Sequence, residues 1–260
     1  MIISTWNVNS IKVRLHAVIQ YLSEEQPDVL VLQETKCIDD NFPIDEIMSA
    51  GYHSVFCGQQ KYNGVAILSK QKAKNIIYNP VTTDLNEMRS ISATFNNIQV
   101  LNLYVVNGHD IDSEKYAHKL SWLNALILYV KQTLQNNKNI LILGDFNIAP
   151  TDRDVFDSEA SRDKILCSNK ERALLSNLLS LGFTDLFNNF NFPDNTFSWW
   201  DYRAGSFQRN AGYRIDLILS TKDISQRCYD YKIDSYTRHK SWCLLESRTS
   251  DHAPVRIKLK

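Results

Sequence analysis

Unbroken runs of apolar residues recur along the chain, and several of them end abruptly in polar side chains. The most regular run, residues 140–143, leads into Gly144 and is followed by Asp145 and Asn147. An apolar run that stops at a glycine is typical of a strand buried on both faces of a sheet. Strand side chains alternate, so we expect Asp145 and Asn147 to point the same way. Considered alone, the pair also fits a turn, in which Asp and Asn are common.

Apolar runs and alternating patterns predict the remaining strands, and spacings of three and four residues predict the helices. Strands are expected at 2–6, 29–32, 52–56, 65–69, 90–95, 98–106, 140–143, 196–200, 213–220, 229–235 and 254–259, and helices near 15–22, 43–50, 113–134 and 172–181. In the longest helix the predicted core stripe is Tyr116, Leu120, Leu123, Ile127, Val130 and Leu134. Strands and helices do not alternate throughout, which favours two sheets packed face to face with helices outside over one doubly wound parallel sheet.

Composition adds that this is an ordinary globular chain. Of its 260 residues 43% are hydrophobic and 22% charged, and no repeat or linker divides it, so one domain spanning 1–260 is expected. No apolar run approaches the ~20 residues of a membrane span, and Met1 leads directly into a predicted strand, so we expect a cytoplasmic protein with no membrane partner. The five cysteines are widely spaced, without a C-x-x-C pair, and are expected to be reduced thiols.

Charge gives a nucleic-acid role no support by itself. The formal net charge is zero, with 12 Lys and Arg against 14 Asp and Glu in residues 1–150 and 17 against 15 in residues 151–260. A protein of this kind that binds DNA needs local positive charge, and its acids must be offset by bound cations.

Polar residues at the ends of predicted strands supply the candidate chemistry. They are Asn7, Glu34, Asp145 with Asn147, and Asp251 with His252, while Asp216 interrupts the apolar run at 213–220. A charge within such a run is costly unless it is paired. Carboxylates and amides without a cysteine cluster suit a hard cation such as Mg²⁺. Each of these residues also has an alternative interpretation without chemistry. Glu34 and Asp145 could be solvated acids in loops, and Asp216 and His252 could form a buried structural ion pair. Tyr104 could be an ordinary aromatic residue of a strand.

Seven motifs, in order along the chain, resemble those of the exonuclease III family of apurinic/apyrimidinic endonucleases, within the endonuclease/exonuclease/phosphatase superfamily. They are N-V-N at 7–9, Q-E-T-K at 33–36, Y-N-G-V-A at 62–66, G-D-F-N at 144–147, S-W-W-D-Y-R at 198–203, R-I-D-L at 214–217 and S-D-H-A-P at 250–254. The match spans essentially the whole chain. The S-W-x-D-Y-R and R-I-D-L motifs are the more specific to the DNA-repair branch.

The resemblance implies a four-layered α/β sandwich of the DNase I-like type, with two packed β-sheets flanked by helices. It also implies a Mg²⁺- or Mn²⁺-dependent base excision repair nuclease that cleaves double-stranded DNA 5′ to abasic sites and trims blocked 3′ ends by 3′→5′ exonuclease action. A monomer is expected.

By the same resemblance each polar strand end has a role. Glu34 is the principal metal ligand, with Asn7 and Asp251 beside it and Asp145 and Asn147 also in the metal set. Asp145 orients and deprotonates the attacking water, and Asn147 stabilises the phosphoryl group. The expected phosphate contacts are His252, which Asp216 holds, and Tyr104. These roles suit the reaction, because in-line attack on an anionic phosphate needs a cation and preorganised donors.

Aromatic residues interleaved with Arg203, Arg209 and Arg214 are typical of a nucleic-acid face. In the family the corresponding wall receives a flipped-out baseless sugar, and the resemblance points to Trp199, Tyr213 and Ile215. Extruding such a sugar costs less than flipping a paired base. The expected phosphate-binding residues are Lys12, Lys36, Asn107 and Arg203, whereas alternation places Trp200 in the core.

Two departures from the family pattern leave details open. Val106 stands where the family commonly has proline, and the following loop is short, so the balance of endonuclease to exonuclease activity is undetermined. Asn9–Ser10 replaces the more usual Asn-Gly or Asp-Gly of the family, which leaves the surroundings of the metal ligands open. Two other functions are considered: a phosphatase or lipid phosphodiesterase of the same superfamily, and a nucleic-acid-binding regulator without turnover. The aromatic and arginine rim argues against the first, and the complete set of acids against the second.

Overall fold

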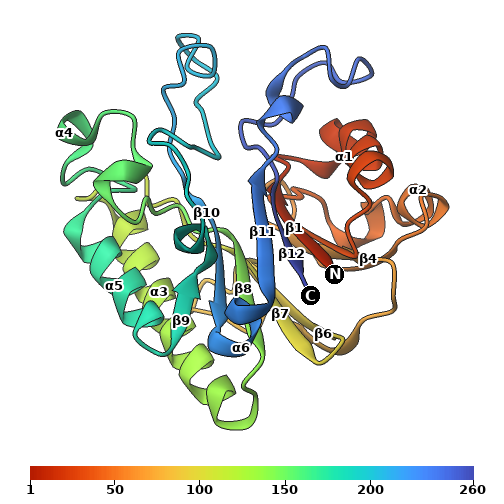
Figure 1. Cartoon of the computed structure of the whole chain (residues 1–260), viewed down its shortest axis with the longest axis horizontal. Coiled ribbons are helices and arrows are strands. Elements are labelled where there is room, and N and C mark those ends of the chain that lie inside the picture. The colour runs from red at the N-terminus through yellow and green to blue at the C-terminus, as the bar shows by residue number, and fades with distance from the viewer.

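The computed structural model describes residues 1–260 and contains two six-stranded sheets packed face to face (Figure 1). The order in the first sheet is β11 (Cys228–Ile233), β12 (Val255–Leu259), β1 (Ile2–Asn7), β2 (Val29–Gln33), β4 (Val65–Ser69) and β3 (His53–Cys57). The order in the second is β5 (Lys74–Tyr78), β6 (Ser90–Phe95), β7 (Ile98–Tyr104), β8 (Ile140–Asp145), β10 (Asp216–Thr221) and β9 (Phe183–Asp185).

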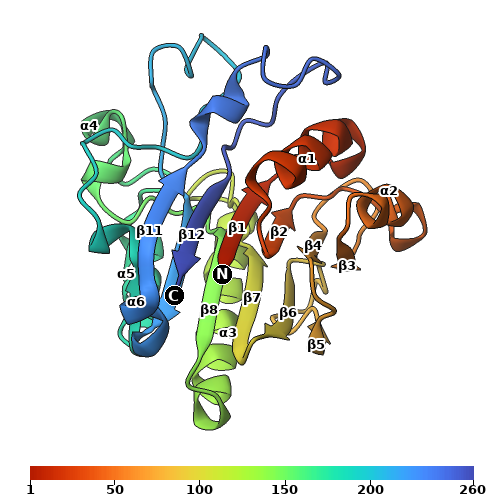
Figure 2. The same cartoon turned by 45° about the vertical axis from the view of Figure 1, so that its right-hand side comes forward.

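Helices cover the outer faces of both sheets, as turning the view makes clear (Figure 2). The helices α1 (Ile11–Glu25) and α2 (Ile44–Ser49) lie on the first sheet, and α3 (Glu114–Asn136) and α5 (Asn169–Leu179) lie on the second. The short helices are α4 (Ser158–Ser161), α6 (Lys222–Arg227), η1 (Asp39–Asn41), η2 (Asp152–Asp154), η3 (Leu186–Asn189) and η4 (Ser235–Arg238). The predicted four-layered sandwich is therefore confirmed. No helix combines the length and apolar composition needed to cross a membrane.

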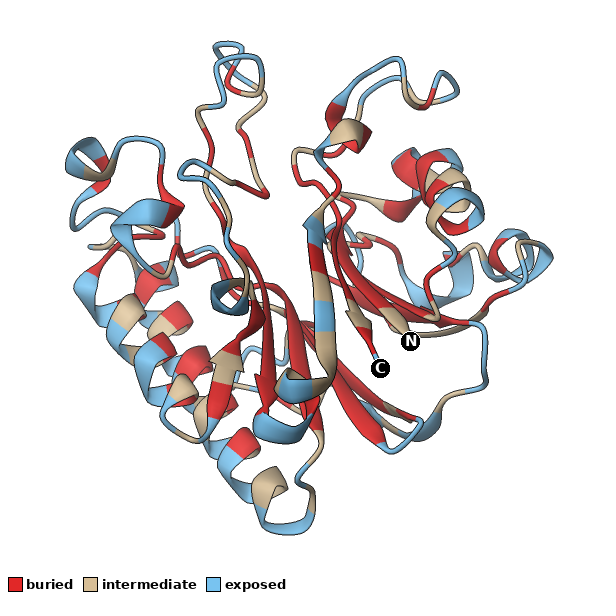
Figure 3. Cartoon of the chain, viewed as in Figure 1, coloured by how far each residue is buried: buried red, intermediate tan, exposed pale blue.

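Three layers of apolar side chains hold the sandwich together. The central strands consist mostly of buried residues (Figure 3). One layer fills the space between the sheets, with Val31, Ile67 and Leu143 among its members. The second lies between β8 and α3, and the third between β2 and α1. Burial on both faces explains why these strands read as unbroken apolar runs.

A pair of buried amides crosses the apolar space between the sheets. Gln33 on β2 donates from Nε2 to Asn102 Oδ1 on β7 at 2.7 Å. Asn102 donates in turn from Nδ2 to the carbonyls of Leu32 and Ala66, both at 2.9 Å. Gln33 Nε2 also contacts Thr5 Oγ1 at 2.9 Å. The two sheets are thus joined by hydrogen bonds as well as by packing.

Several predicted boundaries differ from the structure. Residues 196–200 form no strand, since Trp199 makes only isolated bridges to Tyr213 and His252. The strand predicted at 213–220 begins at Asp216, and the one predicted at 98–106 ends at Tyr104. The buried stripe of α3 is Tyr116, Lys119, Trp122, Leu123, Leu126 and Val130, which is rotated from the predicted one by about one residue.

The elements that prediction missed have weak apolar patterns. Strand β5 is an edge strand exposed at four of its five positions, β9 has only three residues, and α6 buries only Ile224. Such elements depend on tertiary contacts more than on their own periodicity.

Candidate active site

Strand ends from both sheets meet at one edge of the sandwich. Strands β1 and β2 run parallel in the first sheet, so Asn7 and the residue after β2, Glu34, emerge together. In the second sheet Asp145 at the end of β8 pairs with Tyr104 on one side and Asp216 on the other. The segment before β12 brings Asp251 and His252 to the same edge, where Trp6 Nε1 donates to the His252 carbonyl at 3.1 Å.

A buried amide holds the two principal acids together. Asn7 donates from Nδ2 to Glu34 Oε1 at 2.8 Å and to Asp145 Oδ2 at 2.9 Å. Its Oδ1 accepts from the backbone N–H of Asn9 at 2.9 Å, which fixes the orientation of the amide. In this arrangement the Asn7 side-chain nitrogen lies between the two carboxylates, whereas its oxygen, the atom by which an amide binds a metal ion, accepts from the backbone.

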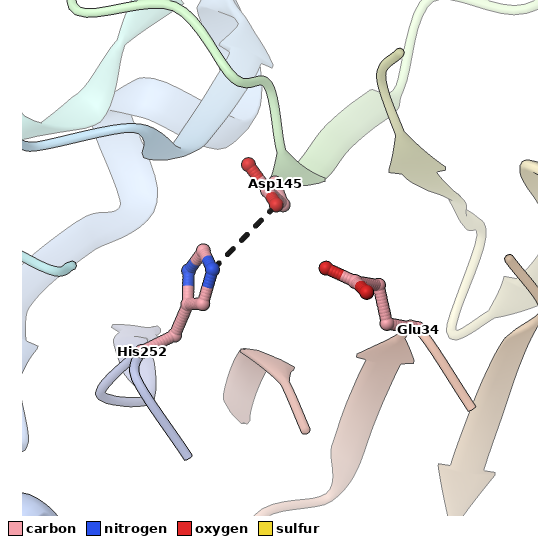
Figure 4. A group of neighbouring side chains, drawn as sticks. All are labelled: Glu34, Asp145 and His252. Atoms are coloured by element: carbon pink, nitrogen blue, oxygen red, sulfur yellow. Dashed lines mark ion pairs between the residues drawn. The ribbon is translucent and has the colours of Figure 1, made fainter. Parts of the chain in front are cut away.

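Asp145 is surrounded by donors. The backbone N–H of Asn147 donates to Oδ1 at 2.9 Å, and the Asn147 side chain donates from Nδ2 to Oδ2 at 3.2 Å. His252 Nε2 lies 3.8 Å from Oδ2 (Figure 4). The expected common direction of Asp145 and Asn147 is observed, although a left-handed turn at Asn147, with φ of 50°, produces it in place of strand alternation.

His252 is oriented by a buried carboxylate, as expected. Its Nδ1 contacts Asp216 Oδ2 at 2.9 Å, and the Ser198 hydroxyl donates to the same oxygen at 2.6 Å. Ser198 Oγ in turn accepts from the backbone N–H groups of Ile215 and Asp216 at 3.2 and 3.1 Å. The chain Ser198–Asp216–His252 leaves Nε2 as the ring nitrogen that faces Asp145.

Burial and mutual charge shift the ionisation of this group. Burial raises the pKa of Asp145 to about 7; His252 opposes this shift, and Asp216 adds to it. Burial alone would lower the pKa of His252, but Asp216 and Asp145 outweigh it and raise that pKa to about 10. At neutral pH His252 is therefore an imidazolium that carries a proton on both ring nitrogens.

Asp251 lies beside these acids but is engaged elsewhere. Its Oδ1 accepts from Asn9 Nδ2 and its Oδ2 from Trp199 Nε1, each at 3.0 Å. Burial would raise the pKa of Asp251, but the His252 charge and these hydrogen bonds outweigh it and lower that pKa. Asn9 Oδ1 accepts from Lys36 Nζ at 2.6 Å, and Lys36 Nζ lies 2.8 Å from Glu34 Oε2. Asp251 is thus linked to Glu34 through two intervening side chains.

Tyr104 lines the opposite side of the group. Burial, followed by the neighbouring Glu34 carboxylate, raises the pKa of Tyr104 well above its ordinary value, so its hydroxyl remains a donor. The Arg89 guanidinium lies over the ring, 4.8 Å from its centroid, and is itself paired with Glu87 at 2.7 Å. Arg89 was missed in the sequence because nothing in its local pattern marks it, and only the fold places it beside Tyr104. Ser198 begins the S-W-W-D-Y-R motif, but its contact with Asp216 was not predicted.

The donor atoms fit a hard cation. Ligand atoms of Glu34, Asp145 and His252 all lie within 4.8 Å of one another (Figure 4). A protonated His252 has no lone pair to offer, so the carboxylate oxygens are the ligands available at neutral pH. Oxygen donors without cysteine match Mg²⁺ or Mn²⁺ better than a softer metal.

Trp199, Tyr213 and Ile215, the residues expected to contact a baseless sugar, lie together in the structure. Trp199 and Tyr213 have ring centroids 5.7 Å apart and pack on a small apolar cluster that contains Ile215. Ile215 itself is buried, so the two aromatic rings present most of the surface. Trp200 is in the core, as predicted.

The residues expected to hold phosphates lie in different settings. Lys12 is exposed, and the Arg203 side chain is exposed and paired with Asp201 at 2.7 Å. Lys36 is half-buried, and Asn107 donates from Nδ2 to Asn147 Oδ1 at 2.9 Å. The expectation that Arg214 belongs to the nucleic-acid face is wrong.

Arg214 instead forms ion pairs inside the protein. It is 1% exposed, and its guanidinium contacts Asp154 at 2.6 Å and Asp185 at 2.9 Å. It also lies over the ring of Phe187, 4.1 Å from the centroid. Two carboxylates and an aromatic face compensate this buried charge, so the side chain is unavailable to DNA.

Several known proteins resemble this chain in both amino-acid sequence and fold. Exodeoxyribonuclease III from Haemophilus influenzae is 33% identical, over 98% of this chain and 98% of its own. The solved structure of the 3′ phosphatase NExo from Neisseria, bound to a product DNA hairpin, superposes with a TM-score of 0.94 at 39% identity, covering 100% of this chain and 99% of that one. An AP endonuclease from Archaeoglobus fulgidus gives a TM-score of 0.92 at 35% identity, again over 100% and 99%.

The family model for the Endonuclease/Exonuclease/phosphatase family matches residues 4–252, a range that contains each of the polar strand ends described above. The resemblance seen in the sequence motifs is therefore confirmed, and the chain belongs to the Endonuclease/Exonuclease/phosphatase family.

Proposed function

We propose that this protein is a metal-dependent DNA repair nuclease that hydrolyses the phosphodiester 5′ to abasic sites and trims 3′ ends of double-stranded DNA. The observation that carries the proposal is the single acidic group formed by Glu34 and Asp145, bridged by Asn7 and faced by the His252 imidazolium. It combines oxygen ligands, a candidate base and a fixed cationic donor within one site. The names of the relatives support DNA as the substrate.

In this proposal Glu34 and Asp145 hold Mg²⁺ or Mn²⁺, with Asn7 and Asp251 at the edge of the site. When bound, the cation would neutralise the phosphate and stabilise the charge that develops on its oxygens. Asn147, whose side chain lies at the same edge, would donate to the phosphoryl group.

Asp145 is the proposed acceptor of the proton from the attacking water. A pKa raised to about 7 gives a carboxylate that is partly ionised at neutral pH and still basic enough to take a proton. Asn7 and Asn147 fix its two oxygens, so the base needs little reorganisation. His252 and Tyr104 would donate to phosphate oxygens from opposite sides, as preorganised donors do at a developing charge.

The DNA itself is proposed to lie across this edge. Trp199 and Tyr213 form an aromatic surface next to Asp251 and are proposed to receive a baseless sugar, while Lys12, Lys36 and Arg203 would contact phosphates. One chain supplies every residue of the site, and the relatives include bacterial exonucleases. We therefore propose that the protein acts as a monomer in the cytoplasm.

The test uses a 5′-labelled duplex with one tetrahydrofuran abasic analogue, incubated with Mg²⁺, Mn²⁺ or EDTA. We expect a single cut 5′ to the analogue that requires the metal, and a loss of about 10²–10⁴-fold in Asp145→Asn. Asp152→Asn is the matched control, because Asp152 is a largely exposed acid paired with Arg172. Cutting that persists unchanged in EDTA or in Asp145→Asn would refute the proposal.

The same site has a second candidate activity, removal of a 3′-phosphate. The specific support is the likeness at 39% identity to a 3′ phosphatase bound to product DNA. A duplex with a 3′-phosphate at a nick, assayed beside the abasic duplex, measures the ratio of the two reactions. Release of inorganic phosphate without cutting at the abasic analogue would restrict the function to 3′-end processing.

A further inference from the structure

Lys119 is a lysine whose side chain is completely buried on the inner face of α3. Its Nζ donates to the backbone carbonyl of Asn147 at 2.7 Å, to the carbonyl of Asn107 at 3.2 Å and to the carboxylate of Glu171. An ammonium has three N–H donors, and these three oxygens use all of them. An isolated buried ammonium is strongly unfavourable, so this set of partners is what makes the position tolerable.

The two carbonyls belong to residues at the active-site edge. Asn107 and Asn147 follow β7 and β8, and their side chains are hydrogen-bonded to each other at 2.9 Å. Asn147 Nδ2 also donates to Asp145 Oδ2 at 3.2 Å and to the Val105 carbonyl at 3.0 Å. Lys119 therefore binds the backbone carbonyls of both asparagines, while the Asn147 side chain contacts the proposed base and the Asn107 side chain contacts Asn147.

The backbone at Asn147 forms a turn that Lys119 holds in place. Its φ of 50° is a left-handed conformation, which asparagine adopts more readily than most other non-glycine residues. A carbonyl fixed by a buried ammonium cannot rotate without leaving one of the three donors unsatisfied. The ammonium thus opposes relaxation of the turn that aims the Asn147 side chain at Asp145.

Glu171 anchors the other end of the contact. It is the third residue of α5 and caps that helix, where Ser168 Oγ accepts from its backbone N–H at 3.3 Å and its carboxylate accepts from the Ser168 backbone N–H at 3.2 Å. Both ends of the Lys119–Glu171 pair are 0% exposed. The outer helix layer, α3 with α5, is therefore connected through one side chain to the turns after β7 and β8.

We propose that Lys119 is a positioning residue, which holds the backbone of Asn107 and Asn147 so that the Asn147 amide stays fixed beside Asp145 and the Asn107 amide beside Asn147. The inference rests on the proposed nuclease function and deepens it. Lys119 touches no solvent and so does not contact substrate; its effect is transmitted through Asn147. A displacement of about 1 Å at such a group is enough to lower turnover by about 10²-fold.

The first experiment compares Lys119→Met with Arg256→Met. Arg256 is a matched control, because it is also buried and pairs with two carboxylates, Asp234 at 2.7 Å and Glu25 at 2.9 Å, away from the site. Both variants are assayed on the abasic duplex at a temperature where circular dichroism shows them folded. We expect kcat to fall about 10²-fold in Lys119→Met with KM within about threefold, and to fall less than about threefold in Arg256→Met. Equal losses of kcat in the two variants would overturn the inference.

A double-mutant cycle with Asn147→Ala separates positioning from general destabilisation. If Lys119 acts through Asn147, adding Lys119→Met to Asn147→Ala lowers kcat little further. Losses that multiply in full would instead show that Lys119 acts independently of Asn147, and the inference would fail.

A readout without activity distinguishes this inference from the proposed function. The side-chain amide NMR signals of Asn107 and Asn147 should shift or broaden in Lys119→Met and stay unchanged in Arg256→Met. If wild-type protein does not cut the abasic duplex, the proposed function fails while this comparison still decides the positioning role. Unchanged signals in Lys119→Met would overturn it whether or not the protein cleaves DNA.

Discussion

Replacing Asp216 by Asn tests how the buried carboxylate controls the charge of His252. Both side chains are almost fully buried, and Asp216 is the chief cause of the raised His252 pKa, about 10 against an ordinary value of 6.5. That shift corresponds to about 5 kcal/mol of preferential stabilisation of the imidazolium. The oxygen of Asn can still accept from Ser198, so the substitution removes the charge and one of the two acceptor oxygens, and we expect a loss of about 3 kcal/mol, the lower end for breaking a buried pair.

The sign of the pH dependence follows from the direction of the shift. A histidine whose folded pKa is raised contributes stability that is fully present below its unfolded pKa, near 6.5, and lost as the pH rises through about 10. The difference in unfolding free energy between wild type and Asp216→Asn should therefore be largest near pH 5 and shrink as the pH rises toward 10, because His252 loses its proton at a lower pH in the folded variant than in the folded wild type. At pH 7.5 the variant should also lose about 10²-fold in kcat, because a neutral His252 is a weaker donor to phosphate.

Two measurements on metal-free protein check this reasoning. Titration of the His252 Cε1–H signal by NMR should give a pKa near 10 in wild type and below 6.5 in Asp216→Asn, because burial lowers the pKa when the carboxylate charge is gone. Urea unfolding at several pH values gives the free-energy difference. A stability difference that stays the same from pH 6 to pH 10, or a variant His252 that still titrates near 10, would show that Asp216 does not set this charge.

Two further predictions concern Gly144 and Glu34. Gly144 has φ of 143°, and an added Cβ would lie 2.0 Å from the Leu103 carbonyl, so Gly144→Ala should destabilise by at least about 3 kcal/mol in urea unfolding. Gly182→Ala, at φ of 105° with open space around it, is the control, and equal losses would mean that the clash is unimportant. Mg²⁺ at about 100 times its Kd should stabilise wild type by about 2.7 kcal/mol in thermal melts, reversibly with EDTA, and Glu34→Gln should abolish the effect. An equal Mg²⁺ shift in Glu34→Gln would remove Glu34 from the metal site.

The sequence predicted the sandwich well because the interior strands carry strong patterns. Strand β8 is buried at all six positions, and the run 140–143 signals this directly. Edge strand β5 is mostly exposed and has no comparable run, so only pairing with β6 defines it. The face of α3 was misplaced for a different reason: a lysine occupies a core position, which periodicity alone assigns to the polar side.

The candidate site was predictable in its membership but not in its internal contacts. Motifs named Asn7, Glu34, Asp145 and His252, and the fold brings them together. The motifs do not show that Asn7 faces the acids with its nitrogen, or that Arg214 pairs internally with Asp154 and Asp185. These arrangements depend on residues far apart in sequence, and local patterns carry no information about such distances.

The amides of Gln33 and Asn102, midway between the sheets, have a consequence for how the catalytic edge is aligned. Aliphatic side chains alone would allow one sheet to slide past the other with little change in buried area. With these amides in place, a slip of one residue would leave several polar atoms without hydrogen-bond partners in an apolar interior. Each such unpaired atom destabilises the fold by about 1–3 kcal/mol. Glu34 comes from one sheet and Asp145 from the other. The hydrogen bonds of Gln33 and Asn102 fix how the two sheets are aligned, and through that alignment they fix the spacing of the two acids. A chimera that exchanges one sheet for that of a relative would need to carry both amides to keep a working edge.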